Sequence, residues 1–167
     1  MANAAEERNI WRLLQAVTDP EIPVLSITDL GIVREVKFLP DTGEAVLTLT
    51  PTYSGCPAME AIRLDIRLKL LEHGYPNVTI HEVLSPAWTT DWMSEEGKRK
   101  LHAYGIAPPN PRQQFCNLKE FFEEEGVACP RCGSYDTKLV SRFGSTACKA
   151  LYQCRQCGEA FDYFKCH

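Results

Sequence analysis

Apolar residues recur at helical spacing in three stretches of the first hundred residues. Within residues 6–17 they fall at positions i, i+3, i+4 and i+7, which predicts a helix that ends before Asp19-Pro20. Residues 57–73 predict a second helix, and residues 94–104 predict a third with Ser94 as its cap. The second helix is expected to turn five side chains inward: Met59, Ile62, Ile66, Leu68 and Leu70.

Alternating apolar and polar residues predict two groups of strands. Residues 32–39 and 45–49 predict a hairpin joined at Asp41-Thr42-Gly43, and residues 78–84 predict a third strand. Near the C-terminus, residues 138–143, 150–153 and 160–164 are short and rich in β-branched or aromatic side chains. The expected fold class is therefore α+β, a small mixed or antiparallel sheet covered by helices and followed by a small β domain.

Prolines indicate where the chain divides. Three of them fall within four residues at Pro108-Pro109-Asn110-Pro111, a sequence that forbids a helix and favours extended chain. We expect a first domain at 1–105, a linker at 106–126 and a second domain at 127–167. The linker also contains a short acidic helix candidate at 118–125.

Four cysteines in two close pairs form the most specific chemical signature. Cys129 and Cys132 are separated from Cys154 and Cys157 by about twenty residues, a spacing typical of metal sites. Two such turns supply the tetrahedral sulfur ligands that zinc prefers, so residues 127–166 predict a zinc ribbon. An iron–sulfur cluster could use the same ligands. Two disulfides are the other alternative, but no apolar signal segment follows Met1, so we expect a reducing, cytoplasmic setting.

Charge and hydropathy argue against two classes of partner. The chain has 18 basic and 22 acidic residues, a net charge of −4, and the basic residues are scattered along it. This distribution is unlike a nucleic-acid footprint. No stretch is long and apolar enough to span a bilayer. We therefore expect neither nucleic acid nor membrane as a partner.

Cys56 is the most suggestive residue of the first domain. If Pro57 is the first helical residue, Cys56 lies at a helix N-terminus, where the dipole and free N–H groups lower the pKa of a thiol. A buried cysteine acting as a small apolar residue is an equally weighted alternative. Asp19, Glu21 and Asp29 lie in loops that could share its end of the sheet, although carboxylates in loops are more often caps and turn formers.

Other candidate residues carry weaker signals. Of Trp88 and Trp92, we expect one in the core, while the other could belong to an interface. A possible second site would combine Cys148 and Cys166 with Cys56 or Cys116, and buried packing is the slightly favoured alternative.

Three motifs in the first domain resemble a known family. They are Asp19-Pro-Glu-Ile-Pro-Val24, Thr28-Asp-Leu-Gly-Ile-Val33 and Thr50-Pro-Thr-Tyr-Ser-Gly-Cys-Pro57, and together they resemble the iron–sulfur-assembly domain of SufT-like proteins. Further motifs at 86–93, 143–152 and 161–166 extend the resemblance over nearly the whole chain, to the PaaD family of bacterial phenylacetate degradation.

The resemblance implies a component of the phenylacetyl-CoA epoxidase system, in which a di-iron oxygenase is supplied by a flavin and iron–sulfur reductase. No histidine here follows a glutamate by three residues, and no dinucleotide or flavin motif occurs, so the chain is expected to be non-catalytic. The resemblance implies a maturation factor that assists insertion of iron or an iron–sulfur cluster into the oxygenase or reductase. A structural subunit bridging the epoxidase components is the alternative.

Residue roles follow from the same resemblance. Cys56 would be a transient ligand or partner contact framed by Asp19, Glu21 and Asp29, and the four ribbon cysteines would hold zinc. A homodimer is left open. The family is expected to end in an apolar residue where this chain has His167, so His167 is given no role. A nucleic-acid module and a thiol oxidoreductase using a Cys-x-x-Cys pair are disfavoured alternatives.

Overall fold

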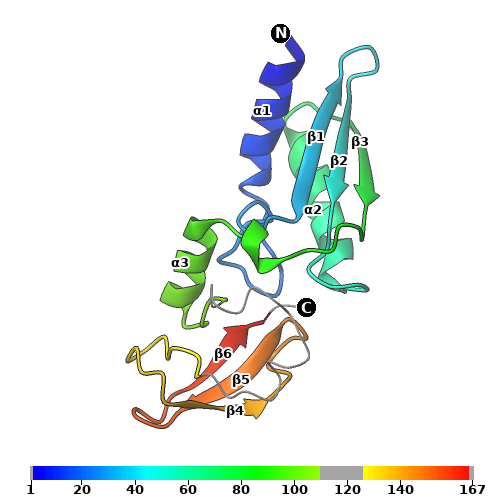
Figure 1. The fold of residues 1–167 in the computed structure, drawn as a ribbon. Helices are drawn as coiled ribbons and strands as arrows, with labels where there is room; N and C mark the ends of the chain where they lie inside the picture. The colour runs from blue at the N-terminus through cyan, green and yellow to red at the C-terminus, as the bar shows by residue number, and fades with distance from the viewer. Residues whose placement is uncertain (1, 110–125, 166–167) are drawn as a thin grey trace. The chain divides into compact units, whose positions relative to one another are not determined.

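The computed structural model describes residues 2–109 and 126–165 (Figure 1). They belong to two compact units. Unit 1 contains the residues up to Trp88 together with Trp92–Ser94, and unit 2 contains Thr89–Asp91 together with the residues from Glu95 onward. Most of the predicted linker lies outside the described residues, so the boundary at residue 105 stays a prediction.

Unit 1 contains a three-stranded sheet in the order β1-β2-β3, formed by Val33–Leu39, Glu44–Leu49 and Asn77–Glu82 (Figure 1). β1 and β2 form the predicted antiparallel hairpin, whereas β3 runs parallel to β2. The sheet is therefore mixed. Alternation places Ala45, Leu47 and Leu49 of β2 in the core, where each is fully buried.

A β-bulge lets β1 bury two residues that are three positions apart. Val33 pairs with Leu49, but Glu35 pairs with Thr48, so Arg34 is an extra residue in the register. Strict alternation would place Val33 and Val36 on opposite faces of the sheet. With the bulge, both are buried.

Two helices cover one side of this sheet. α1 (Ala2–Leu14) packs on β1 and on α2 (Ala58–Glu72), and α2 packs on β3 (Figure 1). α1 begins and ends earlier than predicted. Val17 therefore lies in the loop that follows the helix, but its side chain is still buried. The prediction that Leu68 faces inward was wrong. It is 48% exposed, because the buried positions of α2 follow a helical repeat that leaves Leu68 on the opposite side.

The segment after β3 is anchored to the core of unit 1 by two tryptophans. Trp88 is buried and its Nε1 donates a hydrogen bond to the carbonyl oxygen of Leu30 at 2.8 Å, which confirms the expected core tryptophan. Trp92 ends a short 3-10 helix, η1 (Thr90–Trp92), and is half-buried beneath Arg34, whose guanidinium carbon lies 3.5 Å from the ring centroid. An interface role for Trp92 stays a prediction.

Unit 2 contains α3 (Glu95–Tyr104) and an antiparallel sheet in the order β4-β5-β6, formed by Thr137–Ser141, Lys149–Cys154 and Ala160–Phe164 (Figure 1). Ala107 joins this sheet through a parallel bridge to Tyr163. A small core lies beneath the strands, and Tyr152 stacks on Phe161 at its edge. Its buried members are Ala107, Val127, Cys129, Ala150, Cys154, Phe161 and Tyr163.

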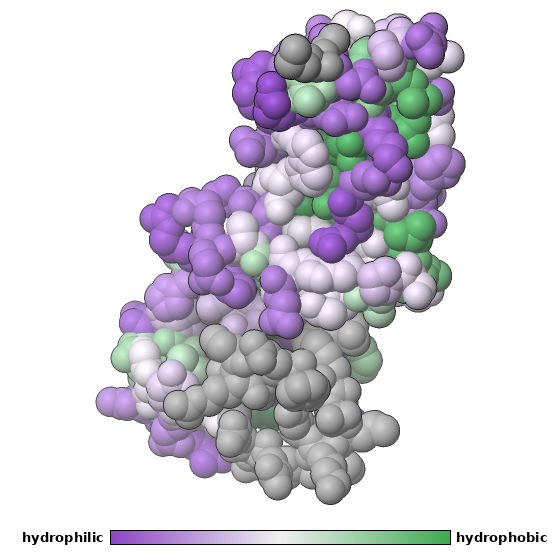
Figure 2. Space-filling model, turned by 45° about the horizontal axis from the view of Figure 1, so that its top comes forward, coloured by the Kyte–Doolittle hydropathy of each residue, from purple (hydrophilic) through white to green (hydrophobic). Residues whose placement is uncertain are grey.

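The two units confirm the predicted α+β fold with a C-terminal ribbon. The helix candidate at 118–125, together with Cys116, Cys166 and His167, lies outside the described residues. Among the described helices none has the length and apolarity needed to cross a membrane. Figure 2 shows apolar surface exposed among the hydrophilic residues of unit 1, the unit that contains the N-terminus.

Candidate metal centre and thiol site

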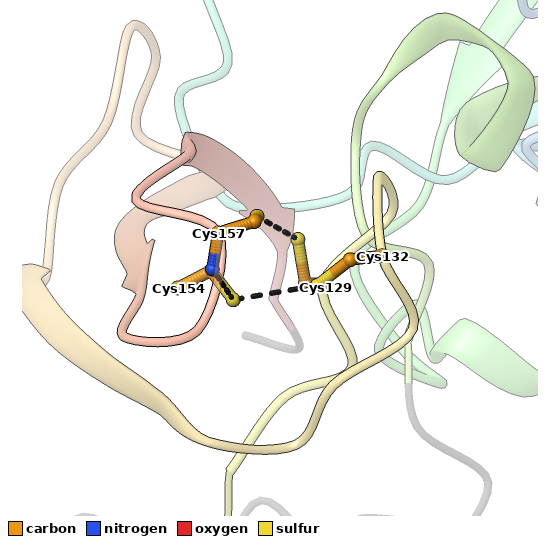
Figure 3. A group of neighbouring side chains, drawn as sticks. All are labelled: Cys129, Cys132, Cys154 and Cys157. Carbon is orange, nitrogen blue, oxygen red and sulfur yellow. Dashed lines mark hydrogen bonds between the residues drawn. The ribbon is translucent and has the colours of Figure 1, made fainter.

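Two similar turns position the four ribbon cysteines. In the first, the N–H of Gly133 donates a hydrogen bond to the carbonyl oxygen of Cys129 at 2.8 Å, and in the second Gly158 donates to Cys154 at 3.0 Å. Both glycines have positive φ, which lets the chain reverse after each pair. The two turns bring their cysteine side chains toward one another (Figure 3).

The four sulfur atoms converge on one point. All lie within 4.8 Å of one another, with Cys129 and Cys157 at 3.8 Å and Cys132 and Cys154 at 3.6 Å. Zinc–sulfur bonds of about 2.3 Å place tetrahedral sulfurs about 3.8 Å apart, so the spacing fits such an ion. It is far too long for a disulfide bond, which is about 2.05 Å. The described cysteines are free thiols.

Thiols packed this closely do not ionise independently. The N–H groups of Cys157 and Gln156 lower the pKa of Cys154 to about 7, against the effect of burial. The N–H of Ser134 lowers the pKa of Cys132. Burial and the hydrogen bonds with the neighbouring thiols together raise this pKa by more, so its net value is about 12. A divalent cation would remove this conflict by stabilising all four thiolates. The donor set is therefore that of a closed metal site.

Cys56 lies just before α2, one residue further from the helix than predicted. The helix begins at Ala58 and Pro57 is its N-cap residue, so Cys56 precedes the cap. The chain enters this position through Gly55, whose φ is +75° and whose missing side chain faces open space. The thiol is half-buried. Cys56 is therefore neither a fully buried cysteine that packs as a small apolar residue nor a fully exposed thiol.

The pKa of Cys56 is shifted in the direction opposite to the prediction. Burial raises the pKa of this thiol above its usual value, and hydrogen bonds from the Ala58 N–H and the Tyr53 side chain lower it less. The negative charges of Glu21 and Asp19 raise it as well. The helix N-terminus thus supplies the expected N–H group, which lowers the pKa. Burial and the carboxylates raise the pKa by more, so the net shift is upward.

The three candidate carboxylates have different roles. Asp19 accepts hydrogen bonds from the N–H groups of Glu21 and Ile22 at 2.7 and 2.9 Å, which makes it a turn former as well as a neighbour of Cys56. Asp29 is buried, and its Oδ1 accepts a hydrogen bond from the Ser94 hydroxyl at 2.9 Å. Asp29 therefore ties two loops together, and no electrostatic effect of it on Cys56 is resolved.

Cys56 and these carboxylates do not form a preassembled metal site. Within residues 2–109 and 126–165, the ribbon cysteines are the group of three or more ligands whose donor atoms converge. Cys148, part of the predicted second site, is buried with its sulfur 3.0 Å from the Thr146 hydroxyl and does not belong to that group. The second site stays a prediction, because Cys116 and Cys166 lie outside the described residues.

Tyr53 is the residue that sequence reasoning missed. Its side chain hydrogen-bonds to the Cys56 thiol and favours the thiolate. The available signal was its place inside the Thr50–Pro57 motif, three residues before the cysteine, in a loop short enough to fold back on itself.

Two family models match the chain in different places. Residues 7–80 match a model described as an iron–sulfur cluster assembly protein, and residues 114–165 match one described as the PaaD zinc beta ribbon domain. The first match contains Cys56 and the second contains all four ribbon cysteines. Each candidate site thus belongs to a different matched family model.

Curated relatives and a solved structure agree with these matches. An Escherichia coli protein named as a putative 1,2-phenylacetyl-CoA epoxidase subunit is 51% identical over 94% of this chain and 91% of its own length. A Porphyromonas gingivalis "Fe-S protein maturation auxiliary factor" is 40% identical over 57% of this chain and 90% of its own. The crystal structure of a DUF59 domain from Bacillus anthracis matches with 31% identity and a TM-score of 0.57, covering 60% of this chain and 95% of that one.

These similarities settle the family. The first relative aligns with both units, whereas the maturation factor and the DUF59 domain each cover little more than half of the chain. The chain belongs to the PaaD family, the proteins similar to this phenylacetyl-CoA epoxidase subunit, in which an iron–sulfur cluster assembly domain is joined to a four-cysteine ribbon.

Proposed function

We propose that this chain is a non-catalytic maturation component of the phenylacetyl-CoA epoxidase system. It helps to insert iron or an iron–sulfur cluster into the oxygenase or its reductase. Support comes from the family model over residues 7–80 and from two kinds of relative, one named as an epoxidase subunit and others named as Fe-S protein maturation auxiliary factors.

One observation carries the proposal: Cys56 is a half-buried single thiol with an incomplete set of metal ligands around it. A thiolate is a good ligand for iron, and the Ala58 N–H and Tyr53 hydrogen bonds stabilise that form. Burial and the charges of Asp19 and Glu21 keep the thiol protonated when no cation is near. Such a site takes up a cation with loss of a proton and releases it again, as a transfer step requires.

The ribbon has a different role in this proposal. Its resident ion is zinc, held by four thiolates that leave no position open for a reactant. The ion stabilises unit 2, whose small core includes two of the ligands, Cys129 and Cys154. Residues 1–105 then form the assembly domain and 127–167 the ribbon domain, joined by the segment 106–126.

Further parts of the proposal concern partners and setting. The oxygenase and the reductase are the proposed partners, and the proposed setting is the cytoplasm, supported by the free thiols of the described cysteines. The absence of a Glu-x-x-His pair and of a nucleotide-binding motif in the sequence supports a non-catalytic role.

The test is the iron content and epoxidase activity of the oxygenase and reductase made in cells without this chain. We expect both proteins to be deficient in metal, and to remain inactive when the purified chain is added back anaerobically without an iron source. Cells with Cys56→Ser should show the same deficiency, whereas cells with the surface variant Leu84→Ser should not. Full metal content without the chain would contradict the proposal.

A structural subunit is the second candidate, favoured by the word "subunit" in the name of the Escherichia coli relative. It predicts immediate recovery of activity when the purified chain is mixed with metal-replete oxygenase and reductase. It also predicts co-purification at a fixed ratio and indifference to Cys56→Ser.

A further inference from the structure

Each of the two cysteine turns of unit 2 contains an arginine and is followed by an acidic residue. Arg131 lies inside the first turn and Asp136 follows it, while Arg155 lies inside the second turn and Glu159 follows it. From the first cysteine of each turn to the acidic residue after it, the sequence has no other charged side chain. The charges around the metal centre, apart from the thiolates, are therefore two arginines and two carboxylates.

Each arginine forms an ion pair with the acidic residue that follows the other turn. Nη1 of Arg131 lies 2.5 Å from Oε2 of Glu159, within hydrogen-bond distance. Nη1 of Arg155 lies 3.7 Å from Oδ1 of Asp136, which is too far for a hydrogen bond. The turns are thus linked in both directions, and of the two links the one through Arg131 adds a hydrogen bond to the attraction of charges.

Arg131 also lies in the electrostatic field of two of the metal ligands. The pKa of its guanidinium is raised first by the hydrogen bond and the charge of Glu159, and then by the charges of Cys157 and Cys129. The sulfur atoms of these two cysteines are 3.8 Å apart. Attraction between a cation and thiolates is mutual, so Arg131 favours the ionised form of the ligands that a zinc ion requires.

Such a cation suits this site because four thiolates carry more negative charge than one zinc ion neutralises. Cys157 is exposed, so part of that excess lies at the surface, beside Arg131. The side chains of Arg131 and Glu159 are themselves 68% and 39% exposed. An ion pair at that exposure adds little to the stability of a fold. Its effect is therefore expected in metal binding rather than in folding.

We propose that Arg131 is a positioning residue of the metal centre: its guanidinium, anchored by Glu159, offsets the excess negative charge at Cys129 and Cys157 and tightens the binding of zinc. Arg155 has no such role. The inference rests on the zinc that the proposed function assigns to the ribbon, but not on the delivery of iron. Zinc affinity of the purified chain and metal content of the epoxidase proteins are measured separately, so either can fail alone.

The test is the zinc affinity of the full chain, measured by competition with a chromogenic chelator at low ionic strength. Arg131→Gln should weaken zinc binding by about fivefold, less than is typical of buried groups that support metal ligands, because Arg131 is exposed. Arg131→Lys should retain most of the affinity, since the charge remains. Arg155→Gln is the matched control. It removes an exposed arginine from the second turn and should change the affinity by less than about twofold.

Glu159→Gln separates the anchor from the charge. It leaves the cation of Arg131 in the protein but weakens the contact that holds it, so zinc binding should weaken by about twofold, less than with Arg131→Gln. High salt should narrow the difference between the wild type and Arg131→Gln, because exposed charges are screened. All these side chains are exposed, and amide NMR spectra of the zinc-loaded variants check that the ribbon is folded.

Alkylation of the zinc-loaded protein, in excess zinc, is a second readout that a purely structural role would not change. Iodoacetamide forms a sulfur–carbon bond with the thiolate and releases iodide. Without the cation of Arg131, the Cys157 thiolate is a stronger nucleophile, so Arg131→Gln should react about twofold faster at this residue. Cys132 is exposed as well and serves as the reference in the same molecule, because mass spectrometry resolves the two peptides.

Four outcomes would overturn the proposal. They are unchanged zinc affinity in Arg131→Gln, equal losses in Arg131→Gln and Arg155→Gln, tighter zinc binding by Glu159→Gln, and equal acceleration of alkylation at both exposed cysteines. The last result would indicate a general loosening of the site. A loss confined to Arg131→Gln, with rescue by Arg131→Lys, would support it.

Discussion

The two thiol sites of this chain differ in how much of a metal site each one assembles. In the ribbon, four sulfur atoms from two loops already lie within 4.8 Å of one another. In unit 1, Cys56 stands alone before a helix, with hydrogen bonds and carboxylates that tune its pKa without completing a ligand set. The comparison teaches that ligand convergence, more than the presence of cysteine, separates a preassembled metal site from a single thiol.

The sites also differ in what holds their surroundings together. Two of the ribbon ligands belong to the small core of unit 2, so that core and the metal site are one structure. Cys56 lies on a unit whose largest fully buried side chains are aliphatic and come from strands, helices and loops. Loss of metal should therefore unfold the ribbon and leave unit 1 folded.

Replacing a ribbon ligand should have the largest effect. Cys154→Ser removes a buried ligand, and we expect the chain to lose its zinc, because structural zinc contributes about 10–16 kcal/mol to the folding of small domains. Metal content by mass spectrometry and amide NMR spectra measure the result. Signals of residues 126–165 should collapse to positions typical of unfolded chain, while those of residues 2–88 persist.

The control for this experiment is Cys56→Ser, which should retain one zinc per chain. Chelation of the wild-type protein should reproduce the Cys154→Ser spectrum. A fully folded ribbon without metal, or unfolding of both units together, would remove the distinction between the two sites.

A smaller effect is expected where unit 1 depends on close backbone packing. A Cβ at Gly31 would lie 2.1 Å from the carbonyl oxygen of Trp92, and φ there is +71°. We expect Gly31→Ala to destabilise the protein by about 3 kcal/mol, since strain and overlap add. Gly55→Ala, with a similar φ but open space, should cost about 1 kcal/mol. Chemical denaturation of zinc-loaded protein measures both, and equal costs would contradict the packing argument.

The smallest expected effect concerns the pKa of Cys56. Glu21→Gln removes a negative charge that raises this pKa, so the thiolate fraction at pH 7 should increase. Tyr53→Phe removes a hydrogen bond that lowers the pKa, so that fraction should decrease. We expect changes of about twofold in alkylation rate, in opposite directions. Mass spectrometry of the Cys56 peptide resolves it from the other cysteines, and changes in the same direction would contradict the assigned causes.

Sequence patterns predicted the helices, the strands and the ribbon ligands better than they predicted the surroundings and the pKa of Cys56. The ribbon ligands follow from spacing, because a Cys-x-x-Cys turn constrains both thiols locally. The helices and strands follow from periodicity, but Leu68 shows the limit. The number of apolar residues in a helix does not identify which of them face the core. In the sequence alone, an exposed apolar residue such as Leu68 cannot be distinguished from a buried one.

The chemistry of Cys56 could not be predicted because it depends on contacts distant in the sequence. A helix N-terminus predicts a lowered thiol pKa, and the Ala58 N–H does lower it. The opposing contributions come from burial and from Glu21 and Asp19, which precede the cysteine by more than thirty residues. Their proximity is set by the fold, which no motif spacing encodes.

At Arg34 the effect of an inserted residue on the backbone can be separated from the effect of its side chain. As the extra residue of the bulge it lets β1 bury both Val33 and Val36, and its guanidinium covers the ring of Trp92. Deleting Arg34 would restore regular pairing and leave Val33 two positions before Val36, so both would still face the core, but the deletion would uncover the ring of Trp92. The core of unit 1 therefore does not need a residue at this position, whereas the cover over the ring of Trp92 does.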